Sequence, residues 1–296
     1  MNYQIGVWGT DAQTEFILVA VDGAIRARRF AIGCHPDIYL DQDTIRWTLI
    51  ENLQALATAA TDGPVAHTLL CLPGRPAFWQ GIAARLQDFS RVSILPSFAP
   101  ALELATRGQP GMLLDCGELN AGVAARTADR ALHGTGNLGW RLGDAGSDYD
   151  VGCRALRRAL AELQGWAEPS AVGRAAGAAL KTTDPVLLPV RLNGPAVAPQ
   201  QIASLAAPIL ELAATTDPIA TGIVRDAVGE LAHAAARLRA RLFVQPDEIV
   251  VGLRGAILQT APAQAVLGQI LGPAGRFVPV RETPAEGLRT LLSRTA

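Results

Sequence analysis

The chain has 296 residues, of which 49% are hydrophobic and 18% are charged, and its formal net charge is -1. These proportions exclude an intrinsically disordered protein, and the length is sufficient for two lobes that each bury a core. The nearly balanced charge gives no electrostatic reason for binding nucleic acid or an anionic membrane, so we expect neither as a partner.

The first 107 residues show strands alternating with helices, which predicts a sheet with helices packed on it. A strong hairpin turn, Asp22-Gly23, joins the second and third strands, and in the third strand arginines should face outward and apolar residues inward. We expect the first helix to be capped by Asp43 or Thr44. The predicted strands are 5–8, 16–21, 24–30, 65–72 and 92–95, and the predicted helices are 43–60, 78–89 and 99–105.

The remainder of the chain starts after a glycine-bounded hinge at 108–111 and again mixes strands with helices. Residues 187–198 contain four breakers and are predicted to be an irregular connection. Asp217 with Pro218 at the first helical position predicts the start of a long helix. The strands and strand-turn units are expected at 112–125, 248–258 and 277–280, and the helices at 155–163, 166–180, 199–214, 217–242, 264–271 and 284–293.

The four cysteines, Cys34, Cys71, Cys116 and Cys153, are widely separated and have no metal-ligand spacing. We therefore expect free thiols in a reducing compartment. The amino terminus lacks a basic stretch leading into an apolar run, and no apolar segment has membrane-spanning length. Together these features predict a cytoplasmic protein.

The glycine-rich segment 136–160 carries the strongest signal for a functional site. Its first half holds four glycines and three carboxylates, and an amphipathic helical pattern follows without a break. A helix beginning near Ser147 or Asp150 would direct its unpaired amide groups towards a bound ligand. The alternative interpretation is an ordinary tight loop capped by Ser147 or Asp148.

This segment resembles the GGWGxLLGDEGSGYxIGxxAL signature of the N-acetylglucosamine kinase and BadF-type ATPase group, within the superfamily of actin and hexokinase. The resemblance implies an α/β, two-lobed actin-like ATPase (ribonuclease H-like) fold in which each lobe is a mixed sheet flanked by helices. It divides the chain into an N-terminal lobe, 1–107, joined by the closing helix 284–296, and a C-terminal lobe, 108–283. It also implies a sugar or amino-sugar substrate, with Asp144 binding sugar hydroxyls. The implied substrate-binding residues are Gly136, Trp140, Gly143, Asp144 and Ser147.

The same resemblance implies ATP and Mg²⁺ as cofactors. It places a first phosphate loop at 6–14, a second phosphate loop within 112–125 and an adenosine loop within 248–258. Asp115 and Glu118 are the implied metal ligands, although a solvated β-turn would also account for them. The implied cofactor-binding residues are Gly9, Thr10, Asp11, Gly117, Asn120, Gly252 and Gly255.

Three departures from the family pattern affect the metal, the catalytic base and the phosphate. Trp8 stands at the position of a metal-positioning Asp, Ser97-Phe98 at the position of the Asn-Asp pair that supplies the catalytic base, and Glu118 at a glycine position. We therefore assign no catalytic residue. Two functions stay open: an ATP-dependent kinase of a sugar or amino sugar (N-acetylglucosamine or glucosamine type), and a degenerate member that binds a sugar, nucleotide or protein partner without phosphoryl transfer. A homodimer is also open.

Overall fold

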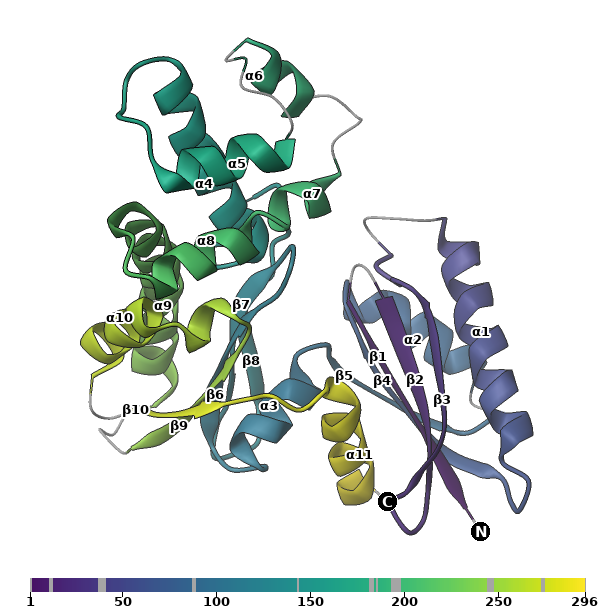
Figure 1. Ribbon diagram of the computed structural model, residues 1–296. Helices are drawn as coiled ribbons and strands as arrows, with labels where there is room; N and C mark the ends of the chain where they lie inside the picture. The colour runs from purple at the N-terminus through teal and green to yellow at the C-terminus, as the bar shows by residue number, and fades with distance from the viewer. Residues whose placement is uncertain are drawn as a thin grey trace. The chain divides into compact units, whose positions relative to one another are not determined.

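The computed structural model describes residues 2–10, 13–36, 41–86, 89–142, 144–180, 184, 186–192, 198–243, 248–272 and 275–295. The chain divides into two compact units: unit 1 is Met1–Gly108 with Arg281–Ala296, and unit 2 is Gln109–Val280. Each unit is built on a five-stranded mixed sheet flanked by helices (Figure 1). This architecture confirms the predicted fold class.

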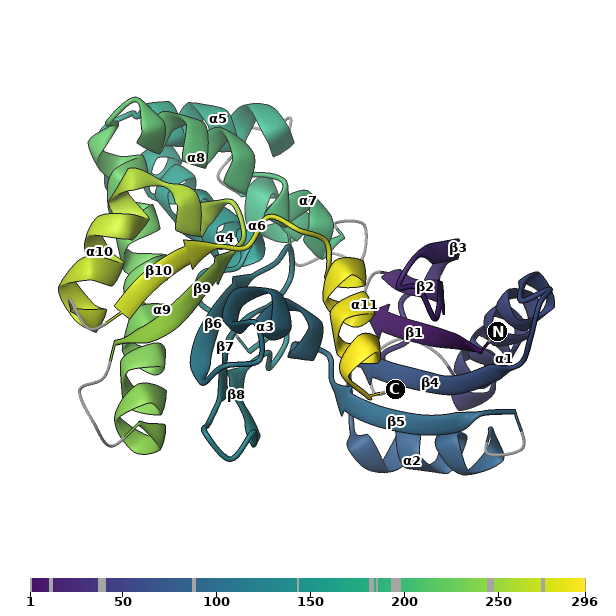
Figure 2. The ribbon, with the colours of Figure 1, turned by 90° about the horizontal axis from the view of Figure 1, so that it is seen from below.

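Unit 1 has the strand order β3-β2-β1-β4-β5, in which β1, β4 and β5 are parallel and β2 and β3 are antiparallel. Helices α1 and α2 share a hydrophobic core with one face of the sheet, and α11 packs on β1 and on α3. Figure 2 shows β1, β4 and β5 side by side, with α2 beneath β5. The elements are β1 (Tyr3–Gly9), β2 (Gln13–Ala20), β3 (Ile25–Ile32), α1 (Gln42–Ala59), β4 (Val65–Leu72), α2 (Pro76–Arg85), β5 (Arg91–Pro96), α3 (Ala99–Thr106) and α11 (Pro284–Thr295).

Two predictions for unit 1 were wrong in detail. The cap of α1 is Asp41, whose carboxylate accepts a hydrogen bond from the Thr44 amide at 2.8 Å, and not Asp43 or Thr44. In β3 the apolar residues do not all face inward, because Phe30 is 55% exposed and Ile32 is 54% exposed. The reason is that β3 is an edge strand, and Phe30 lies two residues from Arg28 on the same face.

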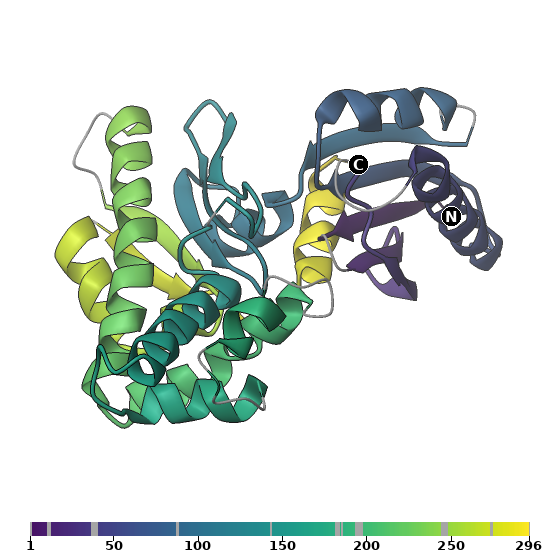
Figure 3. The same ribbon diagram turned by 90° about the horizontal axis from the view of Figure 1, so that it is seen from above.

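Unit 2 has the strand order β10-β9-β6-β7-β8, with β6, β9 and β10 parallel. Its core is formed by β6, β7 and β9 against α4, α8, α9 and α10. Figure 3 shows α9 as the long helix beside α10. The elements are β6 (Gly111–Cys116), β7 (Ala121–Arg126), β8 (Leu132–Gly136), α4 (Asp148–Leu163), α5 (Ala171–Leu180), α6 (Leu187–Leu192), α7 (Pro199–Ala203), α8 (Ala206–Ala214), α9 (Pro218–Leu242), β9 (Ile249–Arg254), the 3₁₀ turn η1 (Ile257–Gln259), α10 (Ala261–Leu271) and β10 (Gly275–Pro279).

The helices of unit 2 differ from the predictions at three places. The helix predicted from 166 starts only at α5, because the Ser170 hydroxyl caps it by accepting from the Gly173 amide at 3.0 Å. Trp166 is 81% exposed in the preceding turn. The predicted irregular connection contains α6, and its residues 193–197 lie outside the described ranges. The helix predicted at 199–214 is divided into α7 and α8. Strand β8, which the sequence analysis did not predict, pairs with β7.

Candidate functional site

The turn after β6 and the start of α4 are joined by backbone hydrogen bonds in unit 2. The amides of Asp148 and Tyr149 donate to the carbonyl oxygens of Gly117 and Glu118 at 3.1 and 2.9 Å. The turn itself is closed by the Gly117 amide, which donates to the Asn120 carbonyl at 2.8 Å. These contacts bring the predicted second phosphate loop next to the glycine-rich segment.

The amino terminus of α4 already has partners for its first amide groups. Ser147 is the N-cap, and its hydroxyl accepts from the Asp150 amide at 3.1 Å. With the Asp148 and Tyr149 amides bonded to the preceding turn, these first three amides are not available to an anion. The expectation that this helix directs unpaired amides at a ligand was therefore wrong, whereas the alternative, a loop capped by Ser147, was correct.

Asp144 holds the glycine-rich loop together. Its two carboxylate oxygens accept from the amides of Leu138 and Gly139, each at 2.9 Å, and its own backbone has a left-handed φ of 33°. The residue is 8% exposed. Burial raises the pKa of this carboxyl above its usual value, and the amide hydrogen bonds act in the opposite direction. The Ala121 backbone also hydrogen-bonds to this carboxylate, whose two oxygens have about four lone pairs, so at least one lone pair stays open to a hydroxyl group.

Gly136 and Trp140 precede Asp144 in the loop. Gly136 has a φ of 85°, and a Cβ atom there would lie 2.7 Å from the Ala121 carbonyl oxygen, so only glycine fits. The centroids of the Trp140 and Tyr149 rings are 5.2 Å apart, and Arg141 Cζ lies 4.9 Å from the centroid of the Trp140 ring. Of the predicted sugar-binding residues, Gly143 lies outside the described ranges.

The two predicted metal ligands have other interactions. Asp115 Oδ2 accepts from Arg254 Nη1 at 2.8 Å, an ion pair that joins the carboxyl ends of β6 and β9. Burial raises the pKa of Asp115, and the Arg254 charge partly offsets this effect. Glu118 lies near Asp148, and burial followed by repulsion from Glu118 raises the pKa of Asp148 to about 6. Within the described ranges, no group of three or more His, Cys, Asp or Glu side chains is placed to hold a metal ion.

Arg254 was missed by the sequence analysis, although it directly follows the apolar run of β9. Next to it, Gly255 has a φ of 114°, and a Cβ atom there would overlap the Cys116 carbonyl oxygen. Gly255 is thus required by the approach of β9 to β6. Gly252 lies inside β9, paired with Leu113.

The predicted first phosphate loop lies in unit 1, at the turn from β1 to β2. The Thr10 amide donates to the Gln13 carbonyl at 2.8 Å, and the Thr10 hydroxyl accepts from the Gln13 amide at 3.2 Å. A Cβ atom on Gly9 would lie 2.8 Å from the Leu72 side chain. Asp11 lies outside the described ranges. The amide and the hydroxyl of Thr10 therefore both take part in closing the turn.

The positions that depart from the family pattern in unit 1 contact each other. Trp8 Nε1 donates to the Ser97 carbonyl at 2.9 Å, and Phe98 is the residue preceding α3. The nearest following carboxylate, Glu103, is 1% exposed and forms an ion pair with Arg294 at 2.6 Å. A buried, paired carboxylate of this kind is poorly placed to accept a substrate proton.

The chain resembles solved structures along nearly its whole length. It is 25% identical to a candidate N-acetylglucosamine kinase from Chromobacterium violaceum, with a TM-score of 0.74 and coverage of 98% of each chain. It is 16% identical to a candidate N-acetylglucosamine kinase from Porphyromonas gingivalis, with a TM-score of 0.71 and coverage of 98% of this chain and 99% of that one. The chain has the fold of the actin-like sugar kinases.

A third sugar kinase of this fold was solved with its ligands. The glucokinase of the ROK family from Streptomyces griseus, in complex with glucose and AMPPNP, has a TM-score of 0.57 and 14% identity, with coverage of 99% of this chain and all of that one. The resemblance to sugar kinases that the sequence predicted is thereby confirmed at the level of fold. No family model and no curated protein matches the chain. No helix within the described ranges is long and apolar enough to cross a membrane.

Proposed function

We propose that this chain is a sugar-kinase-fold protein that binds a sugar or amino sugar, of the N-acetylglucosamine or glucosamine type, and has lost phosphoryl transfer. The observation that supports this proposal best is the hydrogen bond from Trp8 to Ser97. It joins Trp8, at the position where the family resemblance places a metal-positioning Asp, to Ser97, the residue before Phe98, which stands at the position of the catalytic base. An indole bonded to a backbone carbonyl can neither coordinate Mg²⁺ nor accept a proton from a sugar hydroxyl.

The ion pair between Asp115 and Arg254 supports the same proposal. Phosphoryl transfer needs positive charge around the moving phosphoryl group, usually from Mg²⁺. Arg254 places a positive charge beside Asp115, where it would repel a metal ion, and both side chains are mostly shielded from solvent. Moving Arg254 away would leave an uncompensated charge on Asp115, which is costly.

The glycine-rich loop is the proposed ligand site. Asp144 orders this loop through Leu138 and Gly139, and its remaining lone pairs would accept hydrogen bonds from sugar hydroxyls. Trp140, four residues before Asp144 in the same loop, would supply aromatic surface to the apolar side of a sugar ring. Ser147 would act by fixing the start of α4 rather than by touching the sugar.

An active ATP-dependent kinase is the second candidate. It is favoured by the 25% identity that extends over 98% of the chain, including the glycine-rich loop, to a candidate N-acetylglucosamine kinase. In that case Asp115 and Glu118 would hold Mg²⁺, and Gly9, Thr10, Asp11, Gly117, Asn120, Gly252 and Gly255 would line the nucleotide. Asp144 would hold the sugar for attack on the γ-phosphate.

Calorimetry and an ADP-release assay separate the two candidates. The full chain is titrated with glucose, glucosamine and N-acetylglucosamine, and with ATP in the presence and absence of Mg²⁺. We expect saturable binding of at least one sugar and no sugar-stimulated ADP release. Sugar-stimulated turnover with Mg²⁺-dependent ATP binding would establish the kinase instead, and no binding of any sugar would contradict both candidates.

Variants at the altered positions strengthen the assay. Trp8→Asp combined with Phe98→Asp supplies the two missing carboxylates, and Arg254→Met releases Asp115. If transfer was lost through these positions, the combined variant should gain Mg²⁺-dependent ATP binding or turnover. Trp47→Asp, on an exposed position of α1, is the matched control and should gain neither.

The remaining sequence predictions concern partners and location. A homodimer, the lack of nucleic-acid binding and a cytoplasmic location stay predictions. Size-exclusion chromatography with light scattering tests the first, and a filter-binding assay with duplex DNA and single-stranded RNA tests the second.

A further inference from the structure

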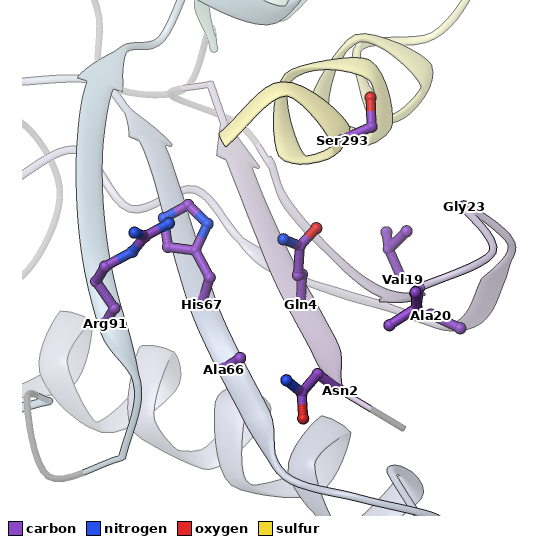
Figure 4. Close-up of a pocket in the computed structure, with 10 residues that line it drawn as sticks. Asn2, Gln4, Val19, Ala20, Gly23, Ala66, His67, Arg91 and Ser293 are labelled. Carbon is purple, nitrogen blue, oxygen red and sulfur yellow. The ribbon is translucent and has the colours of Figure 1, made fainter. Parts of the chain in front are cut away.

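Unit 1 contains a cavity at the opposite end of its parallel strands from the Gly9–Thr10 turn. It has a volume of about 460 Å³ and lies between the amino-terminal ends of β1, β4 and β5, the β2–β3 hairpin and the last turn of α11 (Figure 4). This volume is within the range of small-molecule sites, about 300–1,000 Å³. The cavity belongs to unit 1 alone and is independent of the function proposed above.

Four lining side chains form one row across the sheet. Gln4 on β1 pairs with Val19 on β2 and with His67 on β4, and His67 pairs with Arg91 on β5. Residues paired in this way project from the same face of a sheet. Figure 4 shows the side chains of Gln4, His67 and Arg91 extending from three neighbouring strands.

Helix α11 explains why this row is open. Gly6 lies two residues after Gln4 on β1, on the same face of the sheet, and Leu288 of α11 covers it. The helix reaches its last turn above the row, where the exposed Ser293 forms the rim of the cavity. Helix α11 therefore leaves the polar row uncovered next to its last turn, and this gap is the cavity.

The lining chemistry favours an anion with an apolar body. Arg91, which is exposed, is the charged member of the described lining, and none of these residues is a carboxylate. A guanidinium has five N–H donors, so it can bind an anion in addition to its other interactions. The side-chain amide of Gln4 is a neutral donor beside it. His67 is buried, and its Nε2 shares a hydrogen bond with Ser93 Oγ at 2.9 Å. Burial and the Arg91 charge lower the pKa of His67, so its ring is neutral near pH 7. Val19 and Val21 supply apolar surface on the other side.

We propose that this cavity binds a small organic anion, with its carboxylate or phosphate group at Arg91 and Gln4 and its apolar body against Val19 and Val21. An Arg guanidinium recognises both kinds of anionic group through paired N–H donors. Because the row is built into paired strands, its backbone positions are fixed before the ligand arrives, which reduces the entropic cost of binding.

Calorimetry on the full chain tests the proposal with four probes that share one ring: benzoate, phenyl phosphate, benzyl alcohol and benzylamine. At least one of the two anions should bind saturably, and the alcohol and amine should bind at least about tenfold more weakly. The ratio of the two anion affinities shows whether a carboxylate or a phosphate is preferred. No saturation by either anion below about 10 mM would overturn the proposal, as would equal binding of benzyl alcohol.

Variants locate the binding. Arg91→Met should weaken anion binding at least about tenfold, because it removes the charge and keeps most of the side-chain length. Arg85→Met, which removes an exposed arginine on α2 outside the cavity, is the matched control and should bind like the unmodified chain. Unchanged affinity of Arg91→Met would overturn the proposal.

A second variant protects the test against misfolding. Ser293→Trp adds bulk at the exposed rim of the cavity and removes one exposed hydrogen bond, from the Ser293 hydroxyl to the Thr290 carbonyl. It should abolish binding of both anions while the melting temperature stays close to that of the unmodified chain. Full binding by this folded variant would place the anion elsewhere and contradict the proposal.

Discussion

The indole of Trp8 donates a hydrogen bond to the backbone carbonyl of Ser97 over 2.9 Å, which ties the end of β1 to the turn after β5. These residues are 89 positions apart in the sequence. Replacing Trp8 by Phe keeps an aromatic ring but removes the donor and leaves a partly buried carbonyl without this partner. We expect a loss of about 1 kcal/mol in the free energy of unfolding.

Urea unfolding measures this loss. Trp47→Phe is the matched control, because Trp47 is exposed on α1, and it should change stability by less than about 0.5 kcal/mol. Equal stability of both variants would show that the Trp8 hydrogen bond contributes nothing to the fold.

Asp144 should be essential for the order of the glycine-rich loop. Asp144→Ala removes the acceptors of the Leu138 and Gly139 amides and puts alanine at a φ of 33°, so we expect a destabilisation of about 2 kcal/mol. Asp144→Asn keeps one acceptor and should cost about half as much. Asp226→Ala, an exposed aspartate on α9, is the control. A stability of Asp144→Ala equal to that control would contradict the assigned role.

The pKa of Asp148 predicts a particular pH dependence. Because its folded-state pKa, about 6, lies above the ordinary value of 3.8, the folded chain holds this proton more tightly than the unfolded chain does. The free energy of unfolding should therefore fall as the pH rises from about 4 to about 6. Asp148→Asn should remove this pH dependence. The variant should therefore be more stable than the unmodified chain at pH 7, by about 1–2 kcal/mol more than at pH 4. This difference is smaller than the full pKa shift implies, because the helix amino terminus favours the charged carboxylate.

Glu118 provides the check on the cause. Glu118→Gln removes the repulsion that contributes to the shift, so the NMR titration of the Asp148 carboxyl should move to lower pH. An Asp148 titration near 3.8 in the unmodified chain would refute the prediction directly.

Two glycines should respond in opposite directions to alanine. Gly255→Ala brings a Cβ atom into the Cys116 carbonyl at a φ of 114°, and we expect a loss of at least about 3 kcal/mol. Gly268 lies inside α10 with no atom near its Cβ position, so Gly268→Ala should gain about 0.5–1 kcal/mol. Thermal unfolding of both variants measures the contrast, and a tolerated Gly255→Ala would mean that β9 and β6 are further apart there.

Patterns of neighbouring residues correctly predicted several helices and their first residues. The helix predicted at 43–60 is α1, whose apolar residues at helical spacing, Ile45, Leu49, Leu53 and Leu56, are buried, since helical periodicity alone decides which side chains share a face. Asp217 and Pro218 correctly predicted the start of α9 for a similar reason, because capping depends on adjacent residues. The predicted α4 cap, Ser147, follows the same rule.

By itself the sequence determined most helices and strands and the capped loop of the candidate site, because periodicity, caps and turns act over a few residues. The two-lobed fold class was predicted from the resemblance of the glycine-rich segment to a known family. Only the tertiary structure decided that Arg254 pairs with Asp115, 139 positions away, that Trp8 contacts Ser97, and that β3 is an edge strand with Phe30 exposed. Such facts depend on which strands become neighbours. Strand order is set by the packing of a whole sheet, and no local pattern records it.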